Sequence, residues 1–397
     1  MRSNSLIFSA LVLSSQALAF TLPNQTALKA YDCSECINLS HDNLSTSWAI
    51  KDENLGQHNL HKQLSRKYQV TATLKQLQKG VAIHTQASGA VIRISPTNPD
   101  KKLIPEFQIK AANSAKLSLM DASSLFSKEE GLKETAFAGT TLAIAQLKPE
   151  LGSGEFIVSS SSKALAQTDG GSTYIIHVFD SNSTTELSIE TDKAHYQFGD
   201  PLKSTISLRD KNFSYSIDTI EVNLISPDGQ KTTLPTQRVN ESSYEISYPL
   251  RSETNDRGQN WYVSASVTGA AGKKTVSRQG HSAFSYTIPS AALRELSRTS
   301  AKGFDFSAKI EVATESRYAL QAVLFGSDGQ GKLHPLQIVQ SAAWLPTGLN
   351  KFDFSFDSNL KSNYKEPFYL GYIRLTDFGQ QKPVYFYDKP IELSNLG

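Results

Sequence analysis

Short stretches in which apolar and polar residues alternate recur along most of this chain, and many of them end at Gly, Pro, Asn or Asp. Ile220, Val222 and Leu224 form one such stretch, and a Pro-Asp-Gly sequence follows it at 227–229. Alternation of this kind is typical of a strand with one buried face. Pro and Gly favour the φ angles of tight turns. The pattern therefore predicts a protein that is mainly all-β.

The stretch from Thr191 to Asp210 predicts the opening of one β-module. Gly199 can adopt the positive φ of a tight corner, and Pro201 suits the first residue of a strand. About seven short strands are expected in this module, which is the number typical of an immunoglobulin-like sandwich. Trp261 begins one of the alternating strands and is a candidate core residue.

Similar patterns before and after this module predict two further β-domains, so that the chain forms tandem β-sandwiches. The length of 397 residues agrees with two to four domains of about 100–150 residues each. The predicted organisation is a signal peptide at 1–19, a polar N-terminal segment at 20–66, a first β-domain at 67–184, the immunoglobulin-like sandwich at 185–289, a helical or irregular linker at 290–300 and a C-terminal β-sandwich at 301–397.

Two local features complete the fold prediction. One short helix is expected in the first domain over Asp121–Glu134, where Asp121 or Ser123 could cap it. The polar N-terminal segment is expected to pack on the first domain.

The N-terminus has the three parts of a secretory signal. Arg2 supplies the positive start, Leu6–Leu13 is a short apolar run, and Ala17-Leu18-Ala19 is a cleavage sequence. Mature protein is expected to start at Phe20 and to be exported to the periplasm or the extracellular space. No later segment has 18 consecutive apolar residues, so no membrane span is expected in the mature chain.

The charge balance excludes some classes of partner. Forty Lys and Arg stand against 38 Asp and Glu, and no long run of one sign occurs. A nucleic-acid-binding protein normally shows a clustered basic face, so no nucleic-acid partner is expected.

Both cysteines lie in a C-x-x-C sequence, Cys33 and Cys36. A small disulfide is the favoured interpretation in an exported protein. A redox pair would normally begin a helix within a βαβ unit, and the surrounding sequence shows none. His58 and His61 would complete a zinc set with the two cysteines, although both spacings depart from the usual ones. No cofactor is expected.

Common catalytic signatures are not found in the sequence: it has no G-x-S-x-G, no H-E-x-x-H, no P-loop and no G-x-G-x-x-G. His177 lies in a strongly apolar strand, Tyr174–Phe179, and a structural role is favoured for it. No catalytic residue is therefore assigned.

The residues that carry the architecture also show a resemblance. They are TYIIHVFDSNSTTELSIETDKAHYQFGDPL (173–202), NWYVSASVTG (260–269) with GHSAFSYTI (280–288), and AAWLPTGLNKFDFSFD (342–357) with YLGYIRLTD (369–377). Over about Lys67 to the C-terminus the chain resembles a family of exported gammaproteobacterial proteins known only as domains of unknown function. Its middle module is also similar to macroglobulin and immunoglobulin-like modules of bacterial surface proteins. The resemblance implies architecture and no catalytic residue.

We favour a non-catalytic exported protein that binds a macromolecule, either a protein or a glycan, or that builds a surface assembly. Exposed aromatic residues of the third domain, with Tyr364, Tyr385 and Tyr387 as candidates, could contact such a partner. Two alternatives stay open. One is a secreted hydrolase with a site of dispersed Asp, Glu and His in the first domain, and the other is zinc binding by the N-terminal segment.

Overall fold

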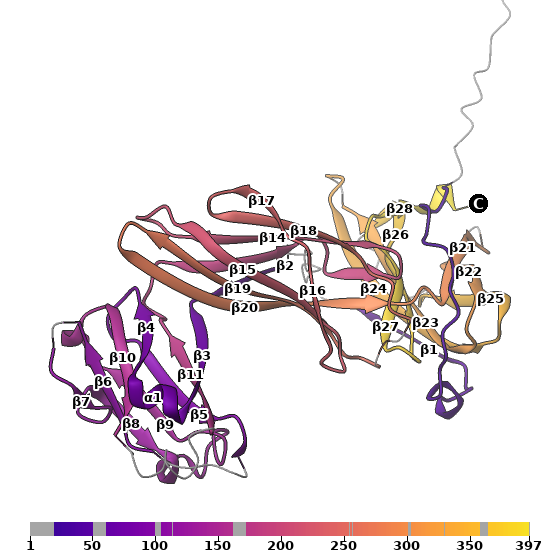
Figure 1. Ribbon diagram of the computed structural model, residues 1–397. Coiled ribbons are helices and arrows are strands. Elements are labelled where there is room, and N and C mark those ends of the chain that lie inside the picture. The colour runs from indigo at the N-terminus through magenta and orange to yellow at the C-terminus, as the bar shows by residue number, and fades with distance from the viewer. Residues whose placement is uncertain are drawn as a thin grey trace, which may run out of the picture. The chain divides into compact units, whose positions relative to one another are not determined.

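The computed structural model describes residues 20–50, 61–99, 105–112, 114–161, 172–253, 255, 257–300, 303–328, 330–357 and 364–396. The chain divides into two compact units, and neither is continuous in sequence (Figure 1). Unit 1 contains residues 1–57, 252–258 and 287–397. Unit 2 contains residues 58–251 and 259–286.

The first part of unit 2 is a β-sandwich of two antiparallel sheets. One sheet has the order β4-β10-β6-β7, and the other has the order β3-β11-β5-β9-β8. The apolar faces of both sheets enclose one core, which includes Ile92, Phe156 and Ile176. Its elements are β3 (Lys67–Thr73), α1 (Leu74–Lys79), β4 (Val81–Thr85), β5 (Val91–Pro96), β6 (Phe107–Ala111), β7 (Leu117–Ser118), β8 (Ser123–Lys128), η3 (Glu129–Leu132), β9 (Ala143–Leu147), η4 (Pro149–Leu151), β10 (Gly154–Ser160) and β11 (Thr173–Phe179).

The prediction of one short helix in this domain is confirmed, but its position was wrong. The helix is α1, which begins after Thr73 with a capping box to Gln76 and ends at Gly80, whose φ is +98°. The predicted segment, Asp121–Glu134, instead contains β8 and the short 3-10 helix η3. Pairing of β8 with β9 decided this conformation, because tertiary hydrogen bonding overrides a weak local preference.

The second part of unit 2 is the predicted immunoglobulin-like sandwich. One sheet has the order β17-β18-β14-β12-β2, and the other has the order β13-β20-β19-β15-β16. Trp261, Val263 and Ala265 are buried along one face of β19, as the alternation predicted. The strands are β2 (His61–Ser65), β12 (Glu186–Thr191), β13 (His195–Gln197), β14 (Pro201–Arg209), β15 (Ser216–Ile225), β16 (Lys231–Thr233), β17 (Gln237–Asn240), β18 (Ser243–Pro249), β19 (Trp261–Ala271) and β20 (Lys274–Thr287).

Unit 1 is built on the C-terminal β-sandwich. Its larger sheet has the order β1-β24-β23-β26-β27, with β28 on β26, and its smaller sheet has the order β21-β22-β25. Phe352, Phe354 and Phe356 are all buried in the core between them. Its elements are η1 (Cys36–Asn38), β1 (Leu44–Ala49), β21 (Ala291–Arg298), β22 (Asp305–Val312), β23 (Ser316–Ser327), β24 (Leu333–Leu345), β25 (Gly348–Ser355), β26 (Lys365–Asp377), β27 (Lys382–Tyr387), β28 (Ile391–Glu392) and η5 (Leu393–Asn395).

Two predictions about the connections were wrong. The N-terminal segment was expected to pack on the first domain, but its residues 20–49 belong to unit 1, where β1 pairs with β24 from Leu44 opposite Ala342 to Ala49 opposite Gln337. Its residues 61–65 form β2, which pairs with β12 of the central sandwich. The predicted linker at 290–300 contains β21, which is a full member of the smaller sheet and buries Leu293. The partner of β1 is distant in sequence, whereas β21 pairs with the next strand, β22, in a local antiparallel pair.

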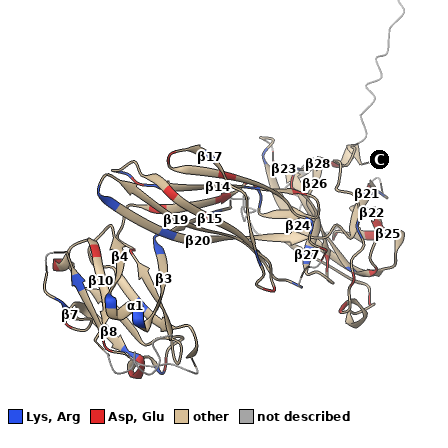
Figure 2. Ribbon diagram, in the orientation of Figure 1, with Lys and Arg blue, Asp and Glu red and all other residues tan. Residues whose placement is uncertain are grey.

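Charges of both signs are interspersed along the described strands of each unit (Figure 2). Among the residues that the structure describes, no helix has the length and hydrophobicity that crossing a bilayer requires.

Candidate functional site

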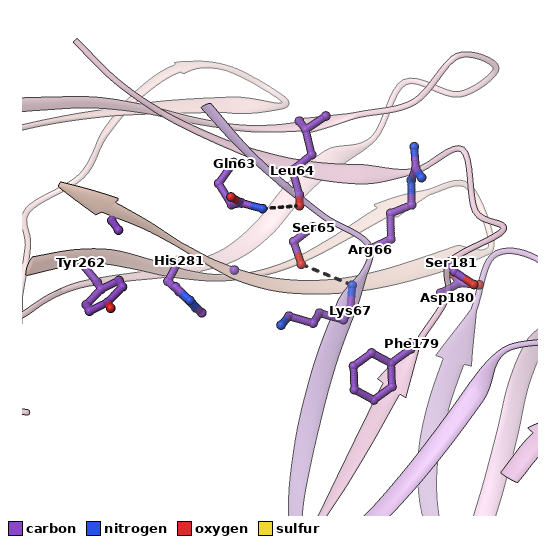
Figure 3. Close-up of a pocket in the computed structure, with 12 residues that line it drawn as sticks. Gln63, Leu64, Ser65, Arg66, Lys67, Phe179, Asp180, Ser181, Tyr262 and His281 are labelled. Carbon is purple, nitrogen blue, oxygen red and sulfur yellow. Dashed lines mark hydrogen bonds between the residues drawn. The ribbon is translucent and has the colours of Figure 1, made fainter. Parts of the chain in front are cut away.

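A notch of about 410 Å³ lies within unit 2, where its two sandwiches meet (Figure 3). One side is formed by β19 and β20, which supply Tyr262 and His281, and the other by the end of β11, which supplies Phe179. The segment that joins β2 to β3 runs through it. The lining is Gln63, Leu64, Ser65, Arg66, Lys67, Phe179, Asp180, Ser181, Tyr262, Gly280, His281 and Ala283.

Close packing of β2 on β20 sets the shape of the notch. Ser65 is buried, and its hydroxyl donates a hydrogen bond to the carbonyl of Gln279. A Cβ at Gly280 would lie 3.0 Å from the Cβ of Ser65, which is tighter than most Cβ contacts, so a side chain here would push Ser65 outward by a few tenths of an ångström. Tyr262 and His281 contact each other edge to face, with ring centroids 5.3 Å apart. The aromatic wall is thereby fixed in place.

A buried ion pair joins the two sandwiches beside the notch, and Asp180 is its member that lines the notch. Arg278 Nη2 lies 2.8 Å from Asp180 Oδ2, and both side chains are almost fully buried, at 0% and 1% exposure. Asp180 also accepts hydrogen bonds from the backbone N–H groups of Gln86 and Ala87. Arg278 donates to the carbonyls of Thr185 and Ser277 and to the hydroxyl of Ser183.

These contacts decide what chemistry the notch can support. Asp180 is the lining carboxylate, and Arg278 neutralises it, so it is not a free general base. Arg66 and Lys67 leave the rim positive, although Arg66 also contacts Glu186 at 3.0 Å. Aromatic rings, amides and cations together suit binding more than acid–base catalysis.

His177 lies on the outward face of β11, directly opposite Arg93 of β5 and Gln69 of β3. Burial, together with the positive charges of Arg93 and Lys67, lowers the pKa of His177 to about 4. Its ring stacks on Phe179, with centroids 6.2 Å apart. The imidazole is therefore neutral at physiological pH, in keeping with the structural role favoured for it.

Acidification is expected to destabilise the protein partly through His177. An unfolded His has a pKa near 6.5, so between about pH 6.5 and pH 4 the unfolded state binds a proton that the folded state does not. Stability contributed by the neutral ring is complete above pH 6.5 and is lost as the pH falls toward 4. Urea unfolding at pH 7.5 and pH 5 should show a smaller loss for His177→Gln than for the unchanged protein. An equal loss in both would contradict the shift, as would an NMR titration of this ring near pH 6.5.

The predicted metal set is not brought together as four free ligands. Cys33 and Cys36 form a disulfide, as favoured from the sequence, so neither sulfur is a thiolate available to zinc. His61 lies in β2 of unit 2, and His58 lies outside the described residues. Within the described ranges, no three His, Cys, Asp or Glu side chains are grouped so that they could share a metal ion.

The disulfide packs on a buried polar cluster of unit 1. A Cβ at Gly379 would lie 2.6 Å from Cys36 Sγ and 2.9 Å from Cys33 Sγ. The disulfide therefore packs directly against the backbone of Gly379, where a side chain would not fit. Beside it, the fully buried carboxylate of Asp377 accepts five hydrogen bonds. The donors are Ser290 Oγ at 2.7 Å, Ser316 Oγ at 2.8 Å, Tyr31 Oη at 2.9 Å, the backbone N of Gly379 at 2.8 Å and Gln380 Nε2 at 3.1 Å.

This cluster is a structural one. Burial raises the pKa of Tyr31, and the Asp377 carboxylate raises it further, so the phenol stays protonated and donates. The negative charge near the disulfide opposes formation of a thiolate at Cys36, whereas reactive cysteines need positive surroundings. The geometry thus supports a disulfide that holds the N-terminal segment on the C-terminal domain.

Aromatic residues of the third domain are less accessible than expected. Tyr385 is 8% exposed and belongs to the core, so its assignment as an exposed candidate was wrong. Tyr387 and Tyr364 are half-buried, and Tyr364 contacts His334. Sequence reasoning missed Arg278, Asp180 and Asp377, and the one available signal was that Arg278 occupies a core-facing position of β20 between Val276 and Gly280.

For the hydrolase alternative, the first domain would need a cluster of perturbed acidic groups. Among its described residues, pKa shifts are found at Tyr68, Arg93 and His177, and none of these is a carboxyl.

Three domain models of one family match the chain in order. The N-terminal domain of the "domain of unknown function (DUF4785)" family matches residues 35–180, the central domain matches 183–287 and the C-terminal domain matches 290–394. The chain belongs to the DUF4785 family. The sequence resemblance is therefore confirmed.

A crystal structure of a DUF4785 family protein from Legionella pneumophila agrees with this membership. It is 40% identical, covers 95% of this chain and 100% of its own, and superimposes with a TM-score of 0.80. Salmonella α-2-macroglobulin is 13% identical to this chain. The match covers 77% of this chain and 21% of the macroglobulin, with a TM-score of 0.29. Escherichia coli α-2-macroglobulin is 14% identical to this chain. The match covers 77% of this chain and 20% of that macroglobulin, with a TM-score of 0.31. A search of curated proteins found no match to this DUF4785 chain.

Proposed function

We propose that this protein is an exported, non-catalytic binding protein and that the notch of unit 2 is its binding site. The observation that carries the proposal is the notch itself. It is concave, has an aromatic wall at Tyr262 and His281, and is positive at Arg66 and Lys67. Among the described lining residues, the one carboxylate, Asp180, is neutralised by Arg278, and the one imidazole, His281, packs against Tyr262, so the lining offers groups that hold a ligand and shows no paired acid and base.

Rigidity supports the same conclusion. A binding site is most effective when its walls are held before the ligand arrives, because little ordering entropy is then lost on binding. Here the two walls belong to different sandwiches, and the buried pair of Arg278 and Asp180 fixes one against the other. The N-terminal leader sequence and the Cys33–Cys36 disulfide support export, since disulfides persist in oxidising compartments.

Binding of the mature chain, residues 20–397, to cell-envelope fractions tests the proposal. We expect saturable binding that Tyr262→Ala weakens by about tenfold, because a central aromatic side chain commonly contributes about 1–2 kcal/mol or more. Tyr248→Ala is the matched control, since Tyr248 is also half-buried in the central sandwich but does not line the notch. Binding that Tyr262→Ala leaves unchanged would overturn the assignment of the site.

A further inference from the structure

The outward face of the sheet β3-β11-β5-β9-β8, here called the cationic face, continues from the wall of the notch. It is the side opposite the core of the first domain, and Lys67 and Phe179 belong to both the face and the notch. Strand register brings its side chains into rows across the sheet. They are Lys67, Gln69, Thr71, Ile175, His177, Phe179, Val91, Arg93, Ser95, Ile144, Gln146, Leu125 and Ser127.

The charge of this face has one sign. Among the described residues on it, Lys67 and Arg93 are cations and none is Asp or Glu. This is unusual within the chain, which carries almost equal numbers of both signs. A face with two cations and no carboxylate of its own is electrostatically complementary to an anion.

The guanidinium group of Arg93 is positioned by two aromatic rings. Its guanidinium carbon lies 5.5 Å from the centre of the Phe137 ring and 5.7 Å from that of Phe179. Its Nε is buried and has no hydrogen-bond partner among the described residues. Two rings therefore orient the group.

Spacing indicates a ligand with repeated negative groups. Lys67 pairs with Phe179 and Arg93 pairs with His177, so the two cations lie two strands apart and two residues apart along the sheet. Strands are about 4.8 Å apart and residues about 3.3 Å apart along a strand, which places the two Cα atoms about 12 Å apart. One small anion cannot contact both at once.

A peptide is disfavoured because the edge of β3 is already occupied. The outward backbone N–H of Gln69 donates to the side-chain oxygen of Gln279 at 3.1 Å, and the Gln279 amide reaches the Gln69 carbonyl at 3.5 Å. An extended peptide cannot pair with this position to lengthen the sheet. The surface instead carries aromatic rings, which can pack on the apolar faces of sugars, and amide side chains, which can hydrogen-bond to sugar hydroxyl groups.

We propose that the cationic face and the adjoining notch bind an anionic polysaccharide, with acidic groups at Lys67 and Arg93 and a sugar ring against Phe179. This inference rests on the proposed binding function and names the class of ligand. His177, whose pKa is lowered first by burial and then by Arg93 and Lys67, stays neutral and leaves the charge of the face to those two cations.

The test compares polygalacturonate with its fully methyl-esterified form, which keeps the sugar ring and removes the charge. Full-length mature protein is expected to bind the acidic polymer at least about tenfold more tightly than the ester, and added salt should weaken the binding. The double variant Lys67→Gln/Arg93→Gln should lose this preference. The control variant Lys75→Gln/Lys79→Gln removes two cations from exposed positions of α1 in the same domain and should retain it.

Several outcomes would overturn the inference. Equal binding of acid and ester would do so, as would equal binding by both double variants or tighter binding of poly-glutamate or a single-stranded oligonucleotide. Circular dichroism and the unfolding midpoint of each variant show whether loss of binding reflects loss of fold. If envelope material is bound in a Tyr262-dependent manner but polygalacturonate is not, only the ligand class is wrong. If neither is bound, the proposed function fails as well.

Discussion

Arg278→Met is expected to lower the free energy of unfolding by about 3–5 kcal/mol, because it leaves Asp180 charged and buried without its cation. Arg278 and Asp180 are 98 residues apart in sequence and 2.8 Å apart in the fold. Removing one member of a fully buried pair costs far more than the pair contributes, since the remaining carboxylate keeps its desolvation penalty. The backbone donors at Gln86 and Ala87 offset that penalty only in part.

Urea unfolding of the variants measures this effect. Arg278→Met/Asp180→Leu should recover much of the loss, because no uncompensated charge is left inside. Arg66→Met is the matched control: it removes an exposed pair with Glu186 at 3.0 Å and should change stability by less than about 1 kcal/mol. If Arg278→Met cost no more than Arg66→Met, the buried pair would not hold the two sandwiches together as described.

Asp377→Ala is expected to have a similar effect in unit 1, lowering the free energy of unfolding by about 3–5 kcal/mol. Five donors converge on this carboxylate, among them Ser290, Ser316 and Tyr31. The three hydroxyls would lose this acceptor, whereas Gly379 N and Gln380 Nε2 keep second acceptors at Ser316 Oγ and the Ile288 carbonyl. Asp377→Asn should cost less, because the amide keeps one oxygen acceptor.

Thermal and urea unfolding of both variants test the prediction for Asp377. Asp388→Ala serves as the control, since Asp388 is exposed and eleven residues further along the chain. Variants that match this control in stability would contradict the role of Asp377 as the centre of the cluster.

Sequence patterns predicted the sandwiches because each strand buries one face, so apolar and polar residues alternate along it. Phe352, Phe354 and Phe356 are an example, and all three are buried. The same rule failed where the conformation of a segment depended on a partner outside that segment. Residues 123–128 became a strand because β9 was available to pair with them, and nothing within the segment itself reports that partner.

The candidate site was beyond sequence reasoning for the same reason. Lys67 and His281 line one notch although more than 200 residues separate them. Alternation along β20 places Arg278 on the core side, which identifies it as anomalous, but no local pattern points to Asp180 as its partner. The disulfide could be predicted because its two cysteines are close in sequence.

The N-terminal segment has a consequence for the order in which the protein assembles. Its backbone contacts run from Phe20, which donates to the carbonyl of Asn395, to β1, which needs β24 as its partner. Synthesis from the N-terminus produces β1 almost 300 residues before β24. Until then Leu44 and Trp48 lack the sheet on which they lie, and closing so long a loop is a slow event. Unit 1 therefore cannot be completed until β24 is present, although it contains the first residues of the described chain, and any product truncated before β24 leaves β1 without its partner strand.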